Sequence, residues 1–143
     1  MPLQRPVDSD IISRLAEGKR LLLDGGTGTE LNRRGLKFPK GGSWSGTAVR
    51  DAPQVVQQVH EDYLHEGVDI VTANSFCTSR LKLATVNLGD SAEEITWRAM
   101  ELASSARDAV RPASMVAGSL SPTDTEDTGE DLEDLPGTLP DKG

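Results

Sequence analysis

An aspartate follows a short apolar run near the start of the chain, and closely spaced glycines follow the aspartate. The stretch LLLDGGTGT, residues 21–29, places Asp24 directly after three leucines. A carboxylate at the end of a buried strand is unfavourable unless another group pairs with it. Asp24 is therefore expected either to be satisfied by a backbone amide or a nearby arginine, or to await a cationic group of a ligand. The residues alone leave both alternatives open.

The three glycines of this stretch, Gly25, Gly26 and Gly28, allow two interpretations. They do not form the dinucleotide-binding pattern G-x-G-x-x-G, because its third glycine would fall on Leu31, and no Gly-Lys-Ser/Thr follows to make a P-loop. Backbone amides of a glycine-rich loop could still bind phosphate. Without any ligand, the glycines would instead serve a tight turn from strand to loop that needs a positive φ.

Three further groups of residues could do chemistry, and each has a simpler structural explanation. The segment GSWSG has Trp44 where a nucleophile elbow has serine, so a mobile loop with one aromatic anchor is favoured. Cys77 could be a thiolate ligand or a nucleophile, but a small buried apolar residue is favoured. His60 and His65 are five positions apart on one predicted helix, so their side chains diverge and cannot chelate a metal together. The residues themselves assemble no zinc site.

The elements that position these residues follow from the apolar pattern, which predicts helices and strands in alternation. The three leucines before Asp24 have the pattern of a strand buried on both faces. Asp51 is expected to cap the helix that follows it, and Ser91 with Glu94 to form a capping box for a later helix. The predicted helices are 9–17, 51–66 and 91–110, and the predicted strands are 21–23, 68–71 and 115–117.

This alternation is typical of an α/β protein with parallel strands joined by helical crossovers. Two connections, 25–50 and 75–90, are long, and both follow the carboxyl end of a predicted strand. Open α/β sheets and barrels bind their ligands at that end, and loops longer than about 12–15 residues are often functional. Asp24 and Asn74 are therefore expected side by side at the base of these loops.

Composition narrows the classes of partner and compartment. The chain has 143 residues, which suits a single domain, and a formal net charge of −8. Most of this charge lies in 122–143, which we predict to be an acidic disordered tail after a domain over 1–121. The near-neutral remainder has no basic stripe, which argues against nucleic acid and anionic membranes as partners. The N-terminus has no signal sequence, no apolar run could span a membrane, and the single cysteine suits a reducing compartment, so a cytoplasmic protein is expected.

Four segments taken in order resemble a known family. They read LLLDGGTGTELNRRG, WSGTAV, PQVVQQVHEDYLHEGVDIVTANSFCTSRLKL and VAGSLSPT, and they extend from about Leu21 to Thr123. Their succession is similar to the opening of the homocysteine S-methyltransferase family. The resemblance implies a TIM-type (β/α)8 barrel in which cysteine-bound zinc takes up the homocysteine sulfur, and a methyl donor converts homocysteine to methionine. Zinc keeps that sulfur as a thiolate that can attack an activated methyl group.

By the same resemblance, Asp24 would hold the ammonium group of homocysteine, while Gly25 and Gly26 would let the backbone approach the substrate. The residues expected beside the substrate at the end of the second strand are Asn74, Ser75 and Phe76.

The segments that resemble the family do not include its zinc ligands. Cys77 does not fall on a zinc-ligand position of the family, whose cysteines lie on later strands and include a Gly-Gly-Cys-Cys segment. The expectation is therefore a truncated homocysteine S-methyltransferase-like protein with the first three βα units of the barrel, without zinc ligands and without an assigned catalytic residue.

Two alternatives stay open. The first is a non-catalytic α/β binding or interaction module, which could self-associate through exposed sheet edges. The second is an enzyme on another small α/β fold that uses Asp24 and a glycine-rich anion site.

Overall fold

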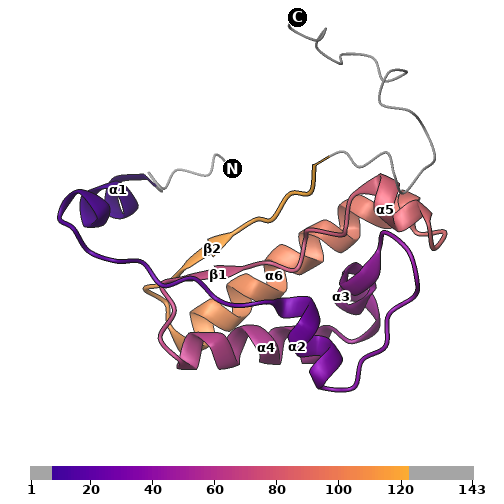
Figure 1. Cartoon of the computed structure of the whole chain (residues 1–143), viewed down its shortest axis with the longest axis horizontal. Helices are drawn as coiled ribbons and strands as arrows, with labels where there is room; N and C mark the ends of the chain where they lie inside the picture. Colours follow the sequence, from indigo (N-terminus) through magenta and orange to yellow (C-terminus); the bar gives the residue numbers. More distant parts are fainter. Residues whose placement is uncertain (1–7, 123–143) are drawn as a thin grey trace, which may run out of the picture.

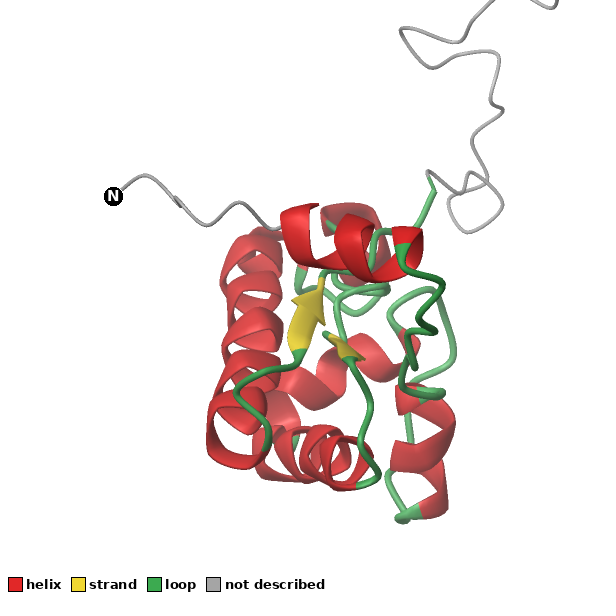
Figure 2. Ribbon diagram, turned by 90° about the vertical axis from the view of Figure 1, so that its left-hand side faces the viewer, coloured by secondary structure: helices red, strands yellow, loops and turns green. Residues whose placement is uncertain are grey.

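Two short parallel strands form the sheet of this protein, whose structure is a computed structural model that describes residues 8–122. Strand β1 (Ile70–Thr72) pairs with β2 (Met115–Ala117), with Ile70 opposite Met115 and Thr72 opposite Ala117. Figure 2 shows the two strands side by side within a frame of helices. The strands predicted at 68–71 and 115–117 are confirmed to within two residues. Apart from residue 122, the predicted acidic tail lies outside the described residues, and the domain division at 121 stays a prediction.

Helices α4 (Pro53–His65) and α6 (Ala92–Val110) form the core with β1. Proline begins α4, where its fixed φ suits the first turn, and Gly67 follows its end with φ +91°. Buried apolar residues recur at helical spacing on the facing sides of both helices. They include Val56, Val59, Leu64, Ile95, Ala99, Leu102 and Ala106. Figure 1 shows the strands running across this helix pair.

The segment predicted as the first strand is reduced to one bridge. Leu23 pairs in parallel with Ile70, while Leu22 and Leu23 are 54% and 57% exposed. The prediction of a strand buried on both faces is therefore wrong. Helix α1 (Asp8–Ala16) lies at one end of the molecule, away from α4 and α6 (Figure 1). An apolar run has the same appearance in sequence whether or not other elements pack on it.

The two long connections contain short helices. Residues 25–50 include α2 (Thr27–Arg33), the 3-10 helix η1 (Trp44–Thr47) and most of α3 (Ala48–Asp51). Residues 75–90 include α5 (Arg80–Ala84) and most of the 3-10 helix η2 (Gly89–Ser91). Both connections still follow the carboxyl end of a chain segment that pairs in the sheet.

Both predicted helix caps are wrong for the same reason. Asp51 is the last residue of α3, and Ala52 precedes α4 without a side-chain cap. Ser91 ends η2 with φ −93° and ψ 7°, and its side chain makes no capping bond to α6. A capping residue needs an extended backbone conformation. Asp51 and Ser91 instead belong to the helical turn that precedes each helix, so neither has that conformation.

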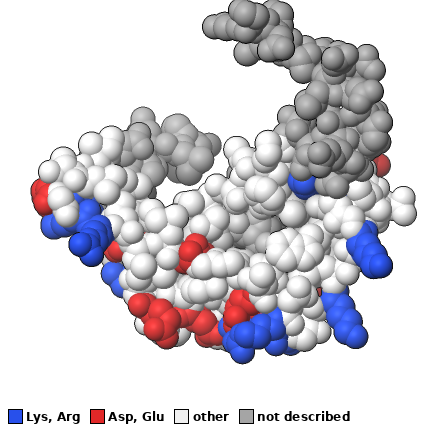
Figure 3. Space-filling model, in the orientation of Figure 1, with Lys and Arg blue, Asp and Glu red and all other residues white. Residues whose placement is uncertain are grey.

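Along the lower rim of the face in Figure 3, where α2 and α4 lie, acidic side chains gather toward the left and basic side chains toward the right. The centre of that face is largely uncharged. In residues 8–122, no helix combines the length and the apolar character needed to cross a membrane.

Candidate functional site

A cavity of about 320 Å³ opens where the chain leaves Leu23 and where β1 ends. Its lining comes from the segments 23–29, 44–45, 72–74 and 76–77 and from Ser119. Sequence and topology bring these segments together because parallel neighbours end at the same edge of a sheet. Five of the six predicted site residues line it: Asp24, Gly25, Gly26, Asn74 and Phe76.

Larger hollows of about 390, 440 and 490 Å³ lie elsewhere in the described structure. The first lies between α2 and α4, and the other two border Trp97, which is exposed on α6. None of them contains a predicted site residue. The cavity at the strand end is therefore the candidate site, because five of the predicted site residues converge there.

Asp24 is held by one residue of β1. The backbone N–H of Thr72 donates to Asp24 Oδ2 and the Thr72 hydroxyl donates to Asp24 Oδ1, each at 2.8 Å. Burial raises the pKa of Asp24 above its usual value, although the hydrogen bonds from Thr72 act in the opposite direction. Of the two sequence alternatives, satisfaction by a backbone amide is thus present, supplemented by a hydroxyl. Among the described residues, no Lys, Arg or His lines the cavity to neutralise this carboxylate.

Close packing, and not a strained turn, accounts for Gly25 and Gly28. Gly25, Gly26 and Gly28 have no positive φ, so the turn explanation is wrong. A Cβ on Gly25 would lie 2.7 Å from the Tyr63 hydroxyl oxygen, and one on Gly28 would lie 2.6 Å from the Trp44 ring. Helix α2 begins directly after Gly26, so the stretch forms no extended loop.

Asn74 and Ser75 hold neighbouring segments in place. Asn74 Nδ2 donates to the Ser45 carbonyl at 2.9 Å, and the Ser45 hydroxyl donates to Asn74 Oδ1 at 3.2 Å. The Ser75 hydroxyl donates to the Ser119 carbonyl at 2.8 Å and accepts from the Ser119 amide at 3.0 Å. Ser75 therefore supports the wall behind the cavity and does not line it.

The aromatic residues of the cavity are partly open to solvent. The Phe76 side chain is 47% exposed, and Lys82 Nζ lies 6.0 Å from the centre of its ring. Trp44 is 40% exposed and meets Phe38 edge to face at 6.1 Å between ring centres.

The segment GSWSG forms the packed helix η1 in place of a mobile loop. Ser43, Ser45 and Gly46 are buried. A Cβ on Gly46 would lie 2.5 Å from the Cys77 carbonyl oxygen, so glycine permits η1 to pack against the chain that follows β1. The prediction of a mobile loop is wrong, because side-chain packing and the bonds to Asn74 hold the segment in place.

The other sequence candidates lie as follows. Cys77 is 6% exposed beside the cavity, as expected of a small buried residue. His60 is fully buried and His65 is exposed, so the two side chains diverge as predicted. Neither ring nitrogen of His60 has a hydrogen-bond partner within residues 8–122, and burial lowers its pKa to about 4.

Thr72 and Trp44 are site residues that the sequence prediction missed. Thr72 precedes Asn74 by two positions, and side chains two apart on a strand share a face. This alternation could have indicated that Thr72 faces the same site as Asn74. The position of Trp44 depends on η1 folding back onto α2, which no local pattern indicates.

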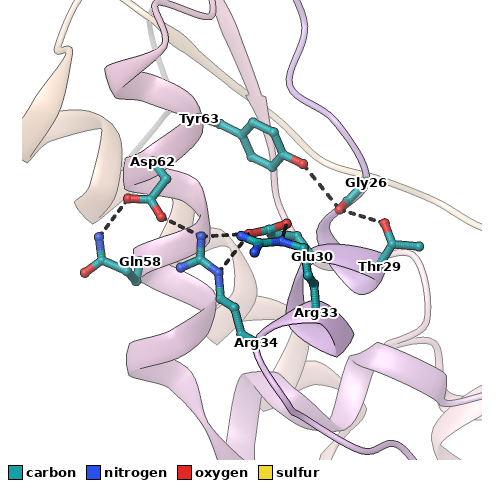
Figure 4. A network of polar contacts seen from close by, with 8 residues as sticks. All are labelled: Gly26, Thr29, Glu30, Arg33, Arg34, Gln58, Asp62 and Tyr63. Carbon is teal, nitrogen blue, oxygen red and sulfur yellow. Dashed lines mark hydrogen bonds and ion pairs between the residues drawn. The ribbon is translucent and has the colours of Figure 1, made fainter.

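A network of polar contacts fixes α2 against α4 (Figure 4). The Arg34 guanidinium pairs with Glu30 on α2 and with Asp62 on α4. Hydrogen bonds from Arg33 and Arg34 lower the pKa of Glu30 to about 2. The Tyr63 hydroxyl donates to the Gly26 carbonyl at 3.4 Å, which connects α4 to the glycine stretch.

Comparison with known proteins gives consistent matches. Residues 21–135 match the family model described as homocysteine S-methyltransferase. A selenocysteine methyltransferase of Astragalus bisulcatus is 31% identical over 109 residues, which are 74% of this chain and 31% of that protein. Betaine–homocysteine S-methyltransferase 1 of Bos taurus is 29% identical over 123 residues, which are 82% of this chain and 29% of that protein. The chain thus spans less than a third of the length of these relatives.

A solved structure also matches. The homocysteine methyltransferase MmuM of Escherichia coli, in a metallated form, superposes with a TM-score of 0.67 at 27% sequence identity. The match covers 78% of this chain and 41% of the other.

Proposed function

Because the chain belongs to the homocysteine S-methyltransferase family, we propose that its cavity binds the amino-acid group of homocysteine or of a closely related thiol or selenol amino acid. The names of the similar proteins support this substrate class. Methyl transfer to the homocysteine thiol, giving methionine, is the activity that we propose this binding serves. The match to a family of barrel proteins also supports a proposal for the fold, in which the paired strands and their helices are consecutive units of a TIM-type barrel.

The observation that carries the proposal is the environment of Asp24. Its carboxylate lines the cavity, burial raises its pKa, and among the described lining residues no cationic side chain accompanies it. A partly desolvated carboxylate is stabilised by an opposite charge nearby. The ammonium group of an amino acid would supply that charge.

The remaining lining residues support the same orientation. Gly25 and Gly26 contribute only main-chain atoms to the cavity wall, beside which the amino-acid end of the substrate would lie. Phe76 offers a half-exposed ring for the aliphatic part of the substrate. In this proposal Asn74 and Ser75 act indirectly, because their polar atoms bond Ser45 and Ser119.

Zinc is implied by the family resemblance, but residues 8–122 do not fit a zinc site. The chain has one cysteine, and in the described part no three His, Cys, Asp or Glu side chains lie together as metal ligands. Catalytic zinc sites in proteins use three side-chain ligands. The function proposed for the described residues is therefore recognition of the amino-acid group.

Binding experiments on the full chain test this proposal. L-Homocysteine should shift the NMR amide signals of the cavity residues, whereas 4-mercaptobutyrate, which lacks the amine, should not. Asp24→Asn keeps the shape of the side chain and removes its charge, so affinity should fall roughly tenfold or more. Equal binding of both compounds, or an unchanged affinity in Asp24→Asn, would contradict the proposal. Inorganic phosphate as a competitor tests the anion-site alternative in the same experiment.

A non-catalytic interaction module is the second candidate. The exposed leucines beside the sheet, Leu22, Leu23 and Leu120, favour it because apolar side chains at a strand edge promote association. A chain that forms a defined oligomer and does not bind homocysteine would support this candidate over the first.

A further inference from the structure

We propose that Thr72 is a positioning residue that fixes the orientation of the Asp24 carboxylate at the cavity. The role of this carboxylate in amine binding rests on the proposed function. The two hydrogen bonds from Thr72 to Asp24, here called the clamp, can be measured in the free protein.

The geometry is a two-point contact from a single residue. The Thr72 amide reaches one carboxylate oxygen and its hydroxyl reaches the other, both at 2.8 Å. Two hydrogen bonds to different oxygens restrict rotation of the Asp24 side chain, which a single bond would permit. Both residues line the same cavity, so the restricted side chain is part of its surface.

The clamp also explains why sheet pairing ends at Asp24. The Asp24 amide donates to the Ile70 carbonyl, and the Ile70 amide donates to the Leu22 carbonyl. In a regular parallel ladder the next bond would run from the Thr72 amide to the Asp24 carbonyl. Here the Asp24 side chain accepts that bond instead. The carboxylate replaces a main-chain group, and the chain is free to turn into α2.

The chemistry favours a charged Asp24. An ionised carboxylate only accepts hydrogen bonds, so the Thr72 hydroxyl must be the donor. Hydrogen bonds to the charged form oppose the effect of burial. Thr72 therefore helps to keep the carboxylate both ionised and oriented, which are the two conditions for pairing with an ammonium group.

Two substitutions of Thr72 separate the hydroxyl from the shape of the side chain. Thr72→Val is nearly isosteric and removes only the hydroxyl bond, whereas Thr72→Ser keeps it. Thr85→Val is the control, because it also removes a threonine hydroxyl that donates a hydrogen bond, here to the Lys82 carbonyl, but Thr85 does not line the cavity.

The first readout is the titration of the Asp24 carboxyl carbon by NMR in the free full-length chain, assigned with Asp24→Asn. The midpoint should move to higher pH in Thr72→Val and should stay at the wild-type position in Thr72→Ser and Thr85→Val. An unchanged midpoint in Thr72→Val would overturn the proposal. If Thr72→Val does not fold, the amide signal of Thr72 in the wild-type chain tests the proposal instead. An amide bonded to the carboxylate must shift with the same midpoint as Asp24, and a Thr72 amide signal that does not shift with Asp24 would overturn the proposal.

The second readout is the affinity for L-homocysteine. Thr72→Val should weaken it about tenfold, as expected for one hydrogen bond to a charged group, and Thr72→Ser should restore most of the loss. Undiminished affinity in Thr72→Val would contradict a positioning role. A wild-type chain that shows the titration effect but no homocysteine binding would refute the proposed function and leave the clamp intact.

Discussion

At the scale of single residues, the cavity and the core each contain a titratable group moved from its ordinary pKa by burial. For Asp24 burial raises the pKa, so the charged form is lost at a higher pH than for an exposed aspartate. Ammonium binding should therefore be complete well above this pKa and should weaken as the pH falls through it. The hydrogen bonds from Thr72 limit how far the pKa rises.

His60 predicts a loss of stability in acid. Its pKa is lowered to about 4 in the fold, against about 6.5 in an unfolded chain, because both ring nitrogens are buried without a partner in the described residues. The unfolded state therefore binds more protons between these values. The contribution of neutral His60 is fully present above pH 6.5 and is lost progressively toward pH 4, by about 3 kcal/mol in total. Urea unfolding at pH 7.5, 6, 5 and 4 measures this dependence.

Two variants identify the source of that dependence. His60→Leu replaces the ring with an apolar side chain of similar size and should flatten the pH profile of the unfolding free energy. His65→Gln is the matched control on the same helix, where the side chain is exposed, and should leave the profile unchanged. A profile that is equally steep in His60→Leu and in wild type would contradict the assignment to His60.

At the scale of elements, α2 depends on α4 for its position. Helix α2 has seven residues, too few to be stable in isolation. The pair between Arg34 and Asp62 and the bond from Tyr63 to Gly26 connect it to α4 (Figure 4). Since Gly25 and Gly26 directly precede α2, this docking also determines the shape of the cavity wall.

Loss of Arg34 should loosen α2. Arg34→Gln removes the pairing with Glu30 and Asp62, so amide hydrogen exchange in α2 should become several-fold faster, with little change in α6. Arg33→Gln is the matched control, because within the described part of the chain Arg33 pairs only inside α2, with Glu30, and its side chain is 72% exposed. Equal exchange rates in the two variants would show that the connection to α4 does not hold α2.

At the scale of the whole molecule, apolar side chains remain exposed beside the sheet. Leu23 lines the edge of the cavity and Leu22 directly precedes it, and the segment that contains them pairs with β1 through a single bridge. Parallel sheets are usually covered on both faces, so this surface is unusual for a sheet of this type. Self-association through the sheet edges is the expected consequence and stays a prediction.

Light scattering on the full chain over a range of concentrations measures this association. Leu22→Lys with Leu23→Lys should lower the apparent mass toward that of one chain. The matched control is Ile12→Lys with Leu15→Lys, because these side chains are 63% and 54% exposed on α1, away from the helix pair. A wild-type chain that is monomeric at every concentration would refute the prediction. An equal effect of both double variants would show that the sheet edge is not the site of contact.

The sequence by itself determined the elements whose signals are local. Helical spacing of apolar residues located α4 and α6, and β-branched residues located β1, because these patterns depend on neighbours within a few positions. The sequence also placed Asp24 at the end of a pairing segment, next to the cavity. Only the tertiary structure supplied its partner Thr72, which lies 48 positions away, and the aromatic ring of Tyr63 that requires glycine at position 25. It also decided that Leu23 is exposed, since the register between distant strands and the arrangement of surrounding helices are collective properties of the packed chain.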